Sequence, residues 1–360
     1  MSAVDACRWA SRSIPCAPYV TSLPWISHYG CYYVVHGDDI TSDSGGEDCY
    51  RYVKAAGRFM VVKRTPGIST TDLVGRMLLC TKNHFIKSLR RVLTGDEGPG
   101  SVEERQRLGE EMVQRIKDYA TDESGLQPGP QVLSWAASKS AMEDSMAEEA
   151  GSYTTMVPGT GPKSGQRIVY VDGGFDLFSS GHIEFLRQVV LFEDEIGRKN
   201  NSGPAYVVAG VHDDEVINHW KGINYPIMNI FERGLCVLQC RYINALIVSA
   251  PFTPSKAYLT NFPFGRLPDA VYHGPTAFMP LTYDPYLAAK ELGIYEEIGE
   301  HAFQNVNAGE IVQRILRSRE MYEARQRAKG EKAAGEDAVK RREEMEREAK
   351  ALEEERAGNR

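Results

Sequence analysis

The sequence predicts an α/β fold built of two Rossmann-like domains with parallel sheets, the first of them incomplete. Short strands rich in Val, Ile and Tyr alternate with helical stretches, which is typical of a parallel sheet wrapped by helices. One sheet is expected to contain a strand that opens at Ile168, followed by strands at 205–210, 242–249 and 270–273. Because doubly wound sheets bind ligands at the carboxyl ends of their strands, the loops after these strands are expected to form one site. A plain α/β scaffold with unrelated loops is the alternative.

An internal repeat indicates two copies of one fold. The motif Cys-Arg-Trp at 7–9 returns as Cys-Arg-Tyr at 240–242, and Val-His-Gly at 35–37 returns as Tyr-His-Gly at 272–274. Carried back from the strand at 168, the same spacing leads to a position before residue 1, so the first copy is expected to lack about 65 residues. The expected parts are an incomplete first domain (1–93, copy one), a linker with a surface helix (94–165), a second domain (166–325, copy two), and a charged helical or disordered tail (326–360).

Composition sets wider bounds. The 360 residues are 42% hydrophobic, enough for two cores, and no stretch approaches the ~20 apolar residues that span a bilayer. A net charge of -7 argues against a general nucleic-acid binder. The seven cysteines lack paired metal spacing, and the N-terminus has no signal-peptide pattern. The chain is therefore expected to be cytoplasmic, with reduced thiols and no metal site of its own.

Copy two opens with a pattern that favours phosphate. An apolar strand leads to Gly173 and Gly174 and then to a helix that begins with Ser179-Ser180-Gly181-His182. Unpaired backbone N–H groups and the positive end of the helix dipole make such a helix start an anion site. Taken alone, the pattern fits a tight strand-to-helix connection equally well.

Copy one holds a second phosphate-type element, the run Arg-Thr-Pro-Gly-Ile-Ser-Thr-Thr at 64–71. Ser69, Thr70 or Thr71 is placed to cap a helix over 72–81, and Arg64 offers a fork of donors to an anion. The corresponding stretch of copy two, 302–307, keeps the helix but has none of these side chains. A simple helix cap is the alternative for 64–71.

Both stretches resemble motifs of the cytidylyltransferases. Residues 174–182 are similar to the signature GxFDxxHxGH, with Ser179 at the position of the first His, and 64–71 are similar to RTxGxST. The resemblance implies that His182, Lys221 and Arg64 are catalytic, with His182 stabilising charge on the α-phosphate of CTP and Arg64 holding its phosphates. It also implies a larger set of residues that hold the nucleotide phosphates: Gly173, Gly174, Phe175, Asp176, Ser179, Gly181, Thr65, Ser69, Thr70 and Thr71.

Further positions match the two-copy members of this family, which form CDP-ethanolamine from CTP and phosphoethanolamine. Lys221-Gly222 resembles the KG element that holds the substrate phosphate, although a lysine before a turn glycine is often simply solvated. Glu232-Arg233 matches an ER pair that either orients a helix by an ion pair or touches a ligand. His36 and Asp39 belong to an HGxD element, whose carboxylate is implied to meet the substrate ammonium.

The resemblance further implies Mg²⁺ bound with CTP, a homodimer, and a cytoplasmic location peripheral to the endoplasmic reticulum. The helix expected at 102–119 either docks on a domain or is loosely attached, and the tail is expected to be solvated because it lacks an apolar face. Two function classes stay open. One is an active nucleotidyltransferase, and the other is an inactive, nucleotide-binding or regulatory relative.

Overall fold

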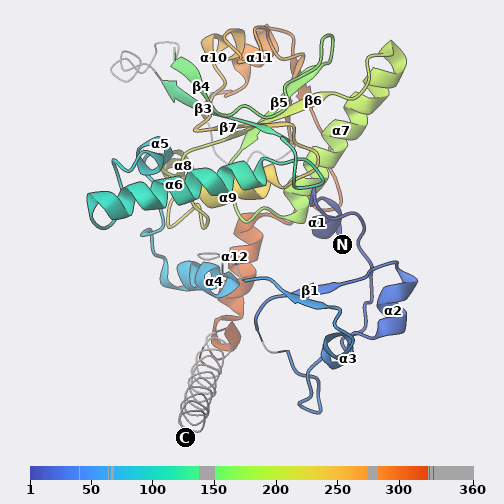
Figure 1. Cartoon of the computed structure of the whole chain (residues 1–360). Helices are drawn as coiled ribbons and strands as arrows, with labels where there is room; N and C mark the ends of the chain where they lie inside the picture. The colour runs from blue at the N-terminus through green and yellow to red at the C-terminus, as the bar shows by residue number, and fades with distance from the viewer. Residues whose placement is uncertain are drawn as a thin grey trace, which may run out of the picture.

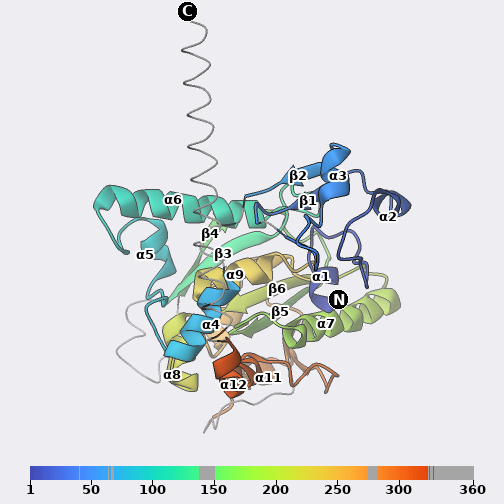
Figure 2. The ribbon, with the colours of Figure 1, turned by 90° about the horizontal axis from the view of Figure 1, so that it is seen from below.

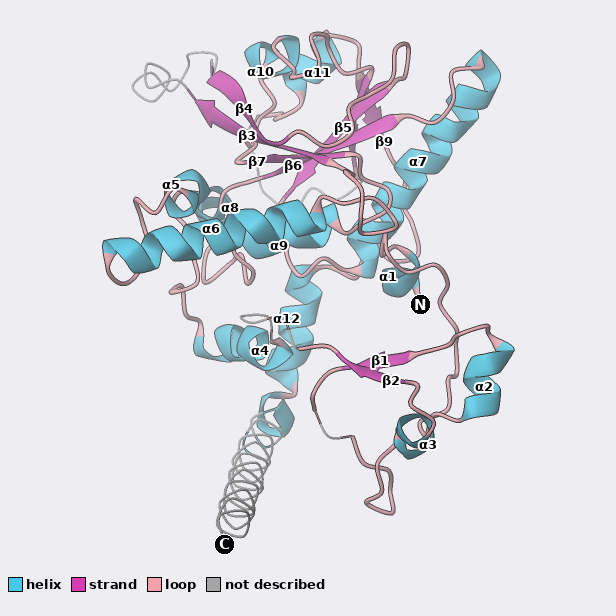
Figure 3. Ribbon diagram, viewed as in Figure 1, coloured by secondary structure: helices cyan, strands magenta, loops and turns pink. Residues whose placement is uncertain are grey.

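The computed structural model describes residues 1–39, 41–63, 65, 69–137, 151–274, 283–322, 324 and 327. Its largest element is a seven-stranded sheet in the order β4-β3-β7-β6-β5-β8-β9, shown in magenta in Figure 3. All neighbouring pairs are parallel except β3 and β4. The strands are β3 (Gln131–Ala137), β4 (Gly151–Val157), β5 (Ile168–Gly173), β6 (Tyr206–Val211), β7 (Ala245–Val248), β8 (Ala270–His273) and β9 (Tyr295–Glu297).

Helices cover both faces of this sheet, as a parallel sheet requires. Helices α6, α7 and α9 lie on one face and α10 and α11 on the other (Figure 1). The bounds are α5 (Leu89–Leu93), α6 (Val102–Tyr119), α7 (Ser180–Asn200), α8 (Asp214–Lys221), α9 (Ile230–Leu238), α10 (Lys256–Thr260), α11 (Leu287–Glu291) and α12 (Ala308–Arg317). No helix in the described ranges is both long and apolar enough to cross a membrane.

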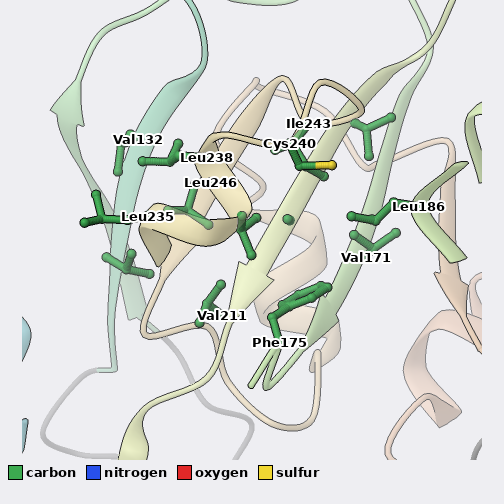
Figure 4. Close-up of a cluster of buried hydrophobic side chains, with 14 of the residues drawn as sticks. Val132, Val171, Phe175, Leu186, Val211, Leu235, Leu238, Cys240, Ile243 and Leu246 are labelled. Carbon is green, nitrogen blue, oxygen red and sulfur yellow. The ribbon is translucent and has the colours of Figure 1, made fainter. Parts of the chain in front are cut away.

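The core follows the alternation of side chains along the central strand β5. Val169 and Val171 point into the cluster beneath α6, α7 and α9, whereas Ile168 and Tyr170 point into the cluster beneath α10 and α11. Figure 4 shows part of the first cluster, in which Phe175 packs among the apolar side chains. Burial of both faces explains why β5 is a continuous apolar run and not an alternating one.

Copy one forms a smaller unit around a two-stranded parallel ladder, β1 with β2. In Figures 1 and 2 this ladder lies apart from the large sheet. Its elements are α1 (Ser2–Asp5), α2 (Leu23–His28), β1 (Val34–His36), α3 (Arg51–Ala55), β2 (Phe59–Val61) and α4 (Thr70–Leu79). The helix expected at 72–81 is thus confirmed, beginning two residues earlier.

The order β1-α3-β2-α4 repeats the order β8-α11-β9-α12 of copy two, and side chains repeat with it. The rings of His36 and Tyr50 lie 4.8 Å apart at 41°, and those of His273 and Tyr286 lie 4.6 Å apart at 46°. The expected internal repeat is therefore present in three dimensions.

What differs is the cover over the first strand of each unit. Tyr272 on β8 is 1% exposed because α7 lies over it, with Glu193 accepting its hydroxyl at 2.6 Å. Val35, at the matching place on β1, is 56% exposed. Within the described residues β1 pairs only with β2, whereas β8 has β5 and β9 on its two sides. Among the described residues, β1 thus lacks the neighbouring strand and the covering helix that β8 has in copy two.

The two copies meet through their repeated Cys-Arg motifs. Cys7 and Cys240 form an antiparallel bridge, and all seven cysteines of the chain are free. Arg8 donates to the carbonyl of Cys240 at 2.8 Å, and Arg241 donates to the carbonyl of Cys7 at 2.9 Å. A second contact joins α4 to α12, where Met77 packs in one apolar cluster with Ile315. These reciprocal contacts give the molecule an approximate internal two-fold symmetry.

Two sequence expectations differ from the structure. Residues 94–165 include the expected helix α6, which is docked on the sheet through Met112 and Ile116, but they also contribute β3 and β4. β3 pairs with β7, so this part of the expected linker belongs to the large sheet. The expected third strand, 242–249, is shorter, because the chain before it turns to meet copy one. The tail expected at 326–360 lies outside the described residues apart from Arg327.

Candidate functional site

A cavity of about 450 Å³ opens at the carboxyl ends of β5, β6 and β8, the place that the strand pattern predicted. Seven of the predicted residues line it: Gly173, Gly174, Phe175, Asp176, Gly181, His182 and Lys221. Other side chains at the cavity were not predicted as site residues, among them Asp172, His212, Phe252, Tyr286, Glu297 and Asn307. The loops after these strands therefore come together around one cavity, as the strand pattern predicted.

The signature turn is compact and strained. Phe175 and Leu177 both have positive φ, at 49° and 50°, which costs energy in side chains other than glycine. A Cβ added to Gly174 would lie 3.1 Å from the Ile217 side chain, and one added to Gly181 would lie 2.6 Å from the carbonyl oxygen of Val306. Glycine at these positions therefore permits close packing.

The N-terminus of α7 is in contact with the segment that precedes α12. The Ser179 hydroxyl donates to the carbonyl of Val306, a residue of the segment that stands where copy one has its Arg-Thr-Pro-Gly element. The carbonyl of Phe303 also faces Gly181, 2.9 Å from the position of an added Cβ. Ser179, predicted to hold nucleotide phosphate, thus has a protein partner here.

His182 is held as a neutral donor. Its Nδ1 accepts the Ser179 backbone N–H at 3.1 Å, which places the ring proton on Nε2. Its ring stacks parallel to Phe178, with centroids 5.9 Å apart. Burial lowers the pKa of His182 to about 4, and the positive charge of Lys221 acts in the same direction. At neutral pH the side chain can donate a hydrogen bond to an anion without carrying charge.

Asp172 is the titratable residue of the site that the sequence reasoning missed. Its Oδ1 accepts the Tyr286 hydroxyl at 2.6 Å, while its Oδ2 is buried without a hydrogen-bond partner. Burial raises the pKa of Asp172 to about 7, against the opposing effects of the Tyr286 and Tyr170 hydroxyls. Its place directly before the two glycines, at the carboxyl end of a buried strand, is the signal that could have identified it.

Asp176 and Phe175 fix the loops around the cavity through a hydrogen-bonded carboxylate and a buried ring. The Asp176 carboxylate accepts the backbone N–H groups of Ile227 and Met228 at 2.8 and 2.9 Å, and only 2% of the residue is exposed. Phe175 is 3% exposed and packs in the main core. Their side chains thus fix the loops that surround the cavity, and their predicted contact with nucleotide stays a prediction.

Arg233 is fully buried and joins four segments of copy two. It donates to the carbonyls of Gly174, His212 and Met228 at 2.6, 2.7 and 3.0 Å, and to the Asp214 carboxylate at 2.7 Å. Its neighbour Glu232 accepts the backbone N–H of Asn229, and so caps α9. Of the two alternatives for the ER pair, the structure supports orientation of helices.

The predicted site residues of copy one do not line this cavity. The Ser69 hydroxyl caps α4 by accepting the Thr71 backbone N–H at 3.2 Å, and Thr70 is the first residue of that helix. Thr65 lies in the loop before it, and His36 packs on Tyr50. Two predicted residues remain to be placed: Asp39, which is exposed beyond β1, and Arg64, which with 66–68 lies outside the described residues.

A duplicated parallel α/β unit, with a strand, two glycines and a histidine-bearing helix start at its cavity, defines the nucleotidyltransferase class. The family model described as cytidylyltransferase-like matches residues 1–76. The chain is 35% identical to ethanolamine-phosphate cytidylyltransferase of Dictyostelium discoideum over 331 residues, 91% of this chain and 79% of that one. The Mus musculus ethanolamine-phosphate cytidylyltransferase is also 35% identical, over 91% of this chain and 75% of its own.

Choline-phosphate cytidylyltransferase A of Homo sapiens is similar over a shorter stretch, 31% identical across 45% of this chain. The similarity to the ethanolamine-phosphate enzymes instead spans both copies. The chain belongs to the ethanolamine-phosphate cytidylyltransferase family.

The buried Arg233 yields a stability prediction. Arg233→Met should lower the free energy of unfolding by about 3–5 kcal/mol, because it leaves the Asp214 carboxylate and three carbonyls buried without their donor. Urea denaturation followed by circular dichroism measures this. Lys199→Met, at an exposed ion pair with Glu195, is the matched control and should leave the midpoint almost unchanged. Equal midpoints for the two variants would contradict the role of Arg233.

His182 yields a titration prediction. In the free protein its ring should stay neutral down to about pH 4, and a bound phosphate should raise its pKa because the anion favours the protonated form. Two-dimensional NMR of the imidazole nitrogens, with and without inorganic phosphate, measures both values. A pKa near 6.5 in the free protein would show that the ring is not held as described.

Proposed function

We propose that this protein transfers the cytidylyl group of CTP to phosphoethanolamine, forming CDP-ethanolamine and pyrophosphate for phosphatidylethanolamine synthesis. Membership of the family supports the activity, since the relatives that bear this name match about nine-tenths of the chain. Nothing in the comparisons favours the inactive alternative. The homodimer and the association with the endoplasmic reticulum stay predictions.

The observation that carries the proposal is the unpartnered oxygen of Asp172. A buried carboxylate oxygen without a donor is costly, and a primary ammonium supplies the missing hydrogen bond together with a positive charge. Tyr286, His273 and Phe252 add aromatic rings to the same cavity, and such rings favour a cation. A trimethylammonium group has no N–H to donate, so this oxygen selects ethanolamine over choline.

Other residues of the cavity lining suit the phosphate of the same molecule. His182 presents an Nε2–H donor, and Lys221, the last residue of α8, lines the cavity beside it. One neutral donor and one cation match a single phosphate group. Phosphoethanolamine thus fits with its ammonium at Asp172 and its phosphate at His182 and Lys221.

The nucleotide is assigned to copy one. The N-terminus of α4, capped by Ser69 and preceded by the Arg64 element, has the donors and the helix dipole that hold phosphates. Transfer requires the two bound substrates to be in contact: a phosphate oxygen of phosphoethanolamine bonds to the α-phosphorus of CTP, and the bond from that phosphorus to the β-phosphate bridging oxygen breaks as pyrophosphate leaves.

Mg²⁺ would arrive with the triphosphate. Among the described residues no group of three or more His, Cys, Asp or Glu side chains is arranged to hold a metal. Mg²⁺ in nucleotide sites is commonly held by substrate phosphates and few carboxylates, so the residues present fit a nucleotide-borne ion. Bound there, Mg²⁺ would neutralise phosphate charge.

A binding experiment tests the assignment of Asp172. Asp172→Asn should weaken binding of phosphoethanolamine by about tenfold or more, because a charge-assisted hydrogen bond is lost. Wild-type affinity should also rise as the pH passes upward through about 7, where Asp172 loses its proton, and the variant should lack this component. Isothermal titration calorimetry between pH 6 and 8 measures both. The phosphate titrates equally with both proteins, so the same profile for the two would overturn the assignment.

A melting experiment tests which copy holds the nucleotide. CTP with Mg²⁺ should raise the melting temperature of the whole chain, because it binds the folded state only. Arg64→Ala should remove most of that rise, whereas His182→Ala should retain it. Differential scanning calorimetry at millimolar CTP measures the shifts. The reverse pattern would place the nucleotide in copy two.

A further inference from the structure

Helix α4 of copy one is bonded to the loop that follows Lys221 in copy two. From α4, Arg76 donates to the carbonyl of Ile227 at 3.0 Å. The same guanidinium reaches both oxygens of Glu232, at 2.8 and 2.9 Å, in a bidentate pair. The side chains of Arg76 and Glu232 are only 11% and 13% exposed, so the pair is shielded from the solvent that weakens surface ion pairs.

Other polar contacts from copy one reach the same loop. The Asn224 amide donates to the carbonyl of Arg76 at 2.8 Å. His84 Nε2 lies 2.8 Å from the carbonyl of Pro226, a donor position for the ring N–H. The loop is therefore bonded to copy one at three places along its length, residues 224, 226 and 227.

Lys82 extends these contacts to the end of α8. Its ammonium donates to Asn218 Oδ1 at 3.0 Å. The Asn218 amide in turn donates to the carbonyls of Gly222, Ile223 and Tyr225, and so closes the turn after Lys221. The turn itself is strained, because Ile223 is β-branched and has a φ of 46°.

The loop is thus held from two sides. Copy two holds it through Asp176, which accepts the N–H groups of Ile227 and Met228. Copy one holds it through Arg76, which donates to the carbonyl of the same Ile227. Apolar packing adds to this, since Ile227 and Tyr225 share a cluster with Met77. A strained turn keeps one conformation only where its surroundings impose it.

We infer that Arg76 is a positioning residue for the phosphate end of the copy-two cavity. It fixes the loop whose Tyr225 ring lies 5.9 Å from the Lys221 ammonium, and so fixes where that ammonium stands. Copy one thereby helps to position the lining of the copy-two cavity, although none of its own described residues lines that cavity. The inference rests on the proposed function only in taking phosphate as the ligand of Lys221.

The repeat supplies a matched control. Arg314 occupies the same position on α12 that Arg76 occupies on α4, and it is exposed. Methionine retains helix propensity and side-chain length at either position. Arg76→Met and Arg314→Met therefore differ in the contacts to the loop and in the ion pair that Arg76 also forms with Asp72 on its own helix, at 2.7 Å.

Hydrogen exchange of the ligand-free whole chain tests the positioning itself. Arg76→Met should speed exchange of the Ile227 and Met228 amides by about tenfold, since local opening becomes easier. Arg314→Met should leave both rates unchanged. Arg76→Lys, which keeps the charge but loses the bidentate fork, should give an intermediate rate and serves if the methionine variant fails to fold. Unchanged exchange in both Arg76 variants would overturn the inference.

Binding and kinetics form the second arm. Arg76→Met should raise the Kd and KM for phosphoethanolamine by about tenfold with a smaller effect on kcat, because ground-state binding of the phosphate is what loosens. Glu232→Gln in that background should add little, since the two groups act as one pair. If the wild-type chain binds no phosphoethanolamine, the proposed function of the cavity fails, while the exchange rates still decide the role of Arg76. A wild-type Kd in Arg76→Met would contradict the inference.

Discussion

The buried guanidinium of Arg233 is the interaction on which the site of copy two depends. Its four hydrogen bonds reach the glycine turn after β5, the end of β6, the start of α8 and the loop before α9. These segments carry Gly174, His182 and Lys221 to one cavity. A buried charge is tolerated only where every donor finds an acceptor of suitable geometry, so the segments are fixed relative to one another. The rigidity of the cavity follows from the requirement to satisfy this one side chain.

The internal repeat gives the chain an interface with itself. Arg8 and Arg241 donate to the carbonyls of each other's neighbouring cysteines, as subunits do across a two-fold axis. The symmetry is lost where equivalent residues of the two copies make different contacts. Arg76 pairs with Glu232 of copy two, whereas Arg314, at the same position on α12, is exposed. The interface is therefore asymmetric: Arg76 of copy one bonds to the loop beside the copy-two cavity, and Arg314 does not repeat this contact.

Much of the fold could be predicted because hydrophobic periodicity and repeated motifs are local signals. Strands β6 and β8 and helix α4 lie where their patterns place them. Strands β3 and β4 were missed because glycine- and proline-rich neighbours made the region read as a linker, and because the decisive fact is a non-local pairing with β7. The site residues also divide into those that local motifs predict and those that only contacts between distant parts of the chain reveal. The glycines, His182 and Lys221 belong to short motifs, whereas the need of Asp172 for a partner appears only once Tyr286, far along the chain, is seen to satisfy one oxygen and not the other.

Electrostatics separates the roles of the two copies. Lys221 is the one lysine or arginine among the described residues that line the copy-two cavity, and His182 is neutral there because its pKa lies at about 4. The same lining includes the carboxylates of Asp172, Asp284 and Glu297. The carbonyl oxygens of Phe303 and Val306 also face the first turn of α7, where their negative ends oppose an incoming phosphate. The charges of this cavity suit one phosphate beside one ammonium, but not the roughly four negative charges of a nucleoside triphosphate.

At the corresponding helix of copy one, the Ser69 hydroxyl caps α4, and the sequence before this helix contains Arg64 and Thr65. The proposed function accordingly assigns the zwitterionic amine to copy two and the polyanion to copy one.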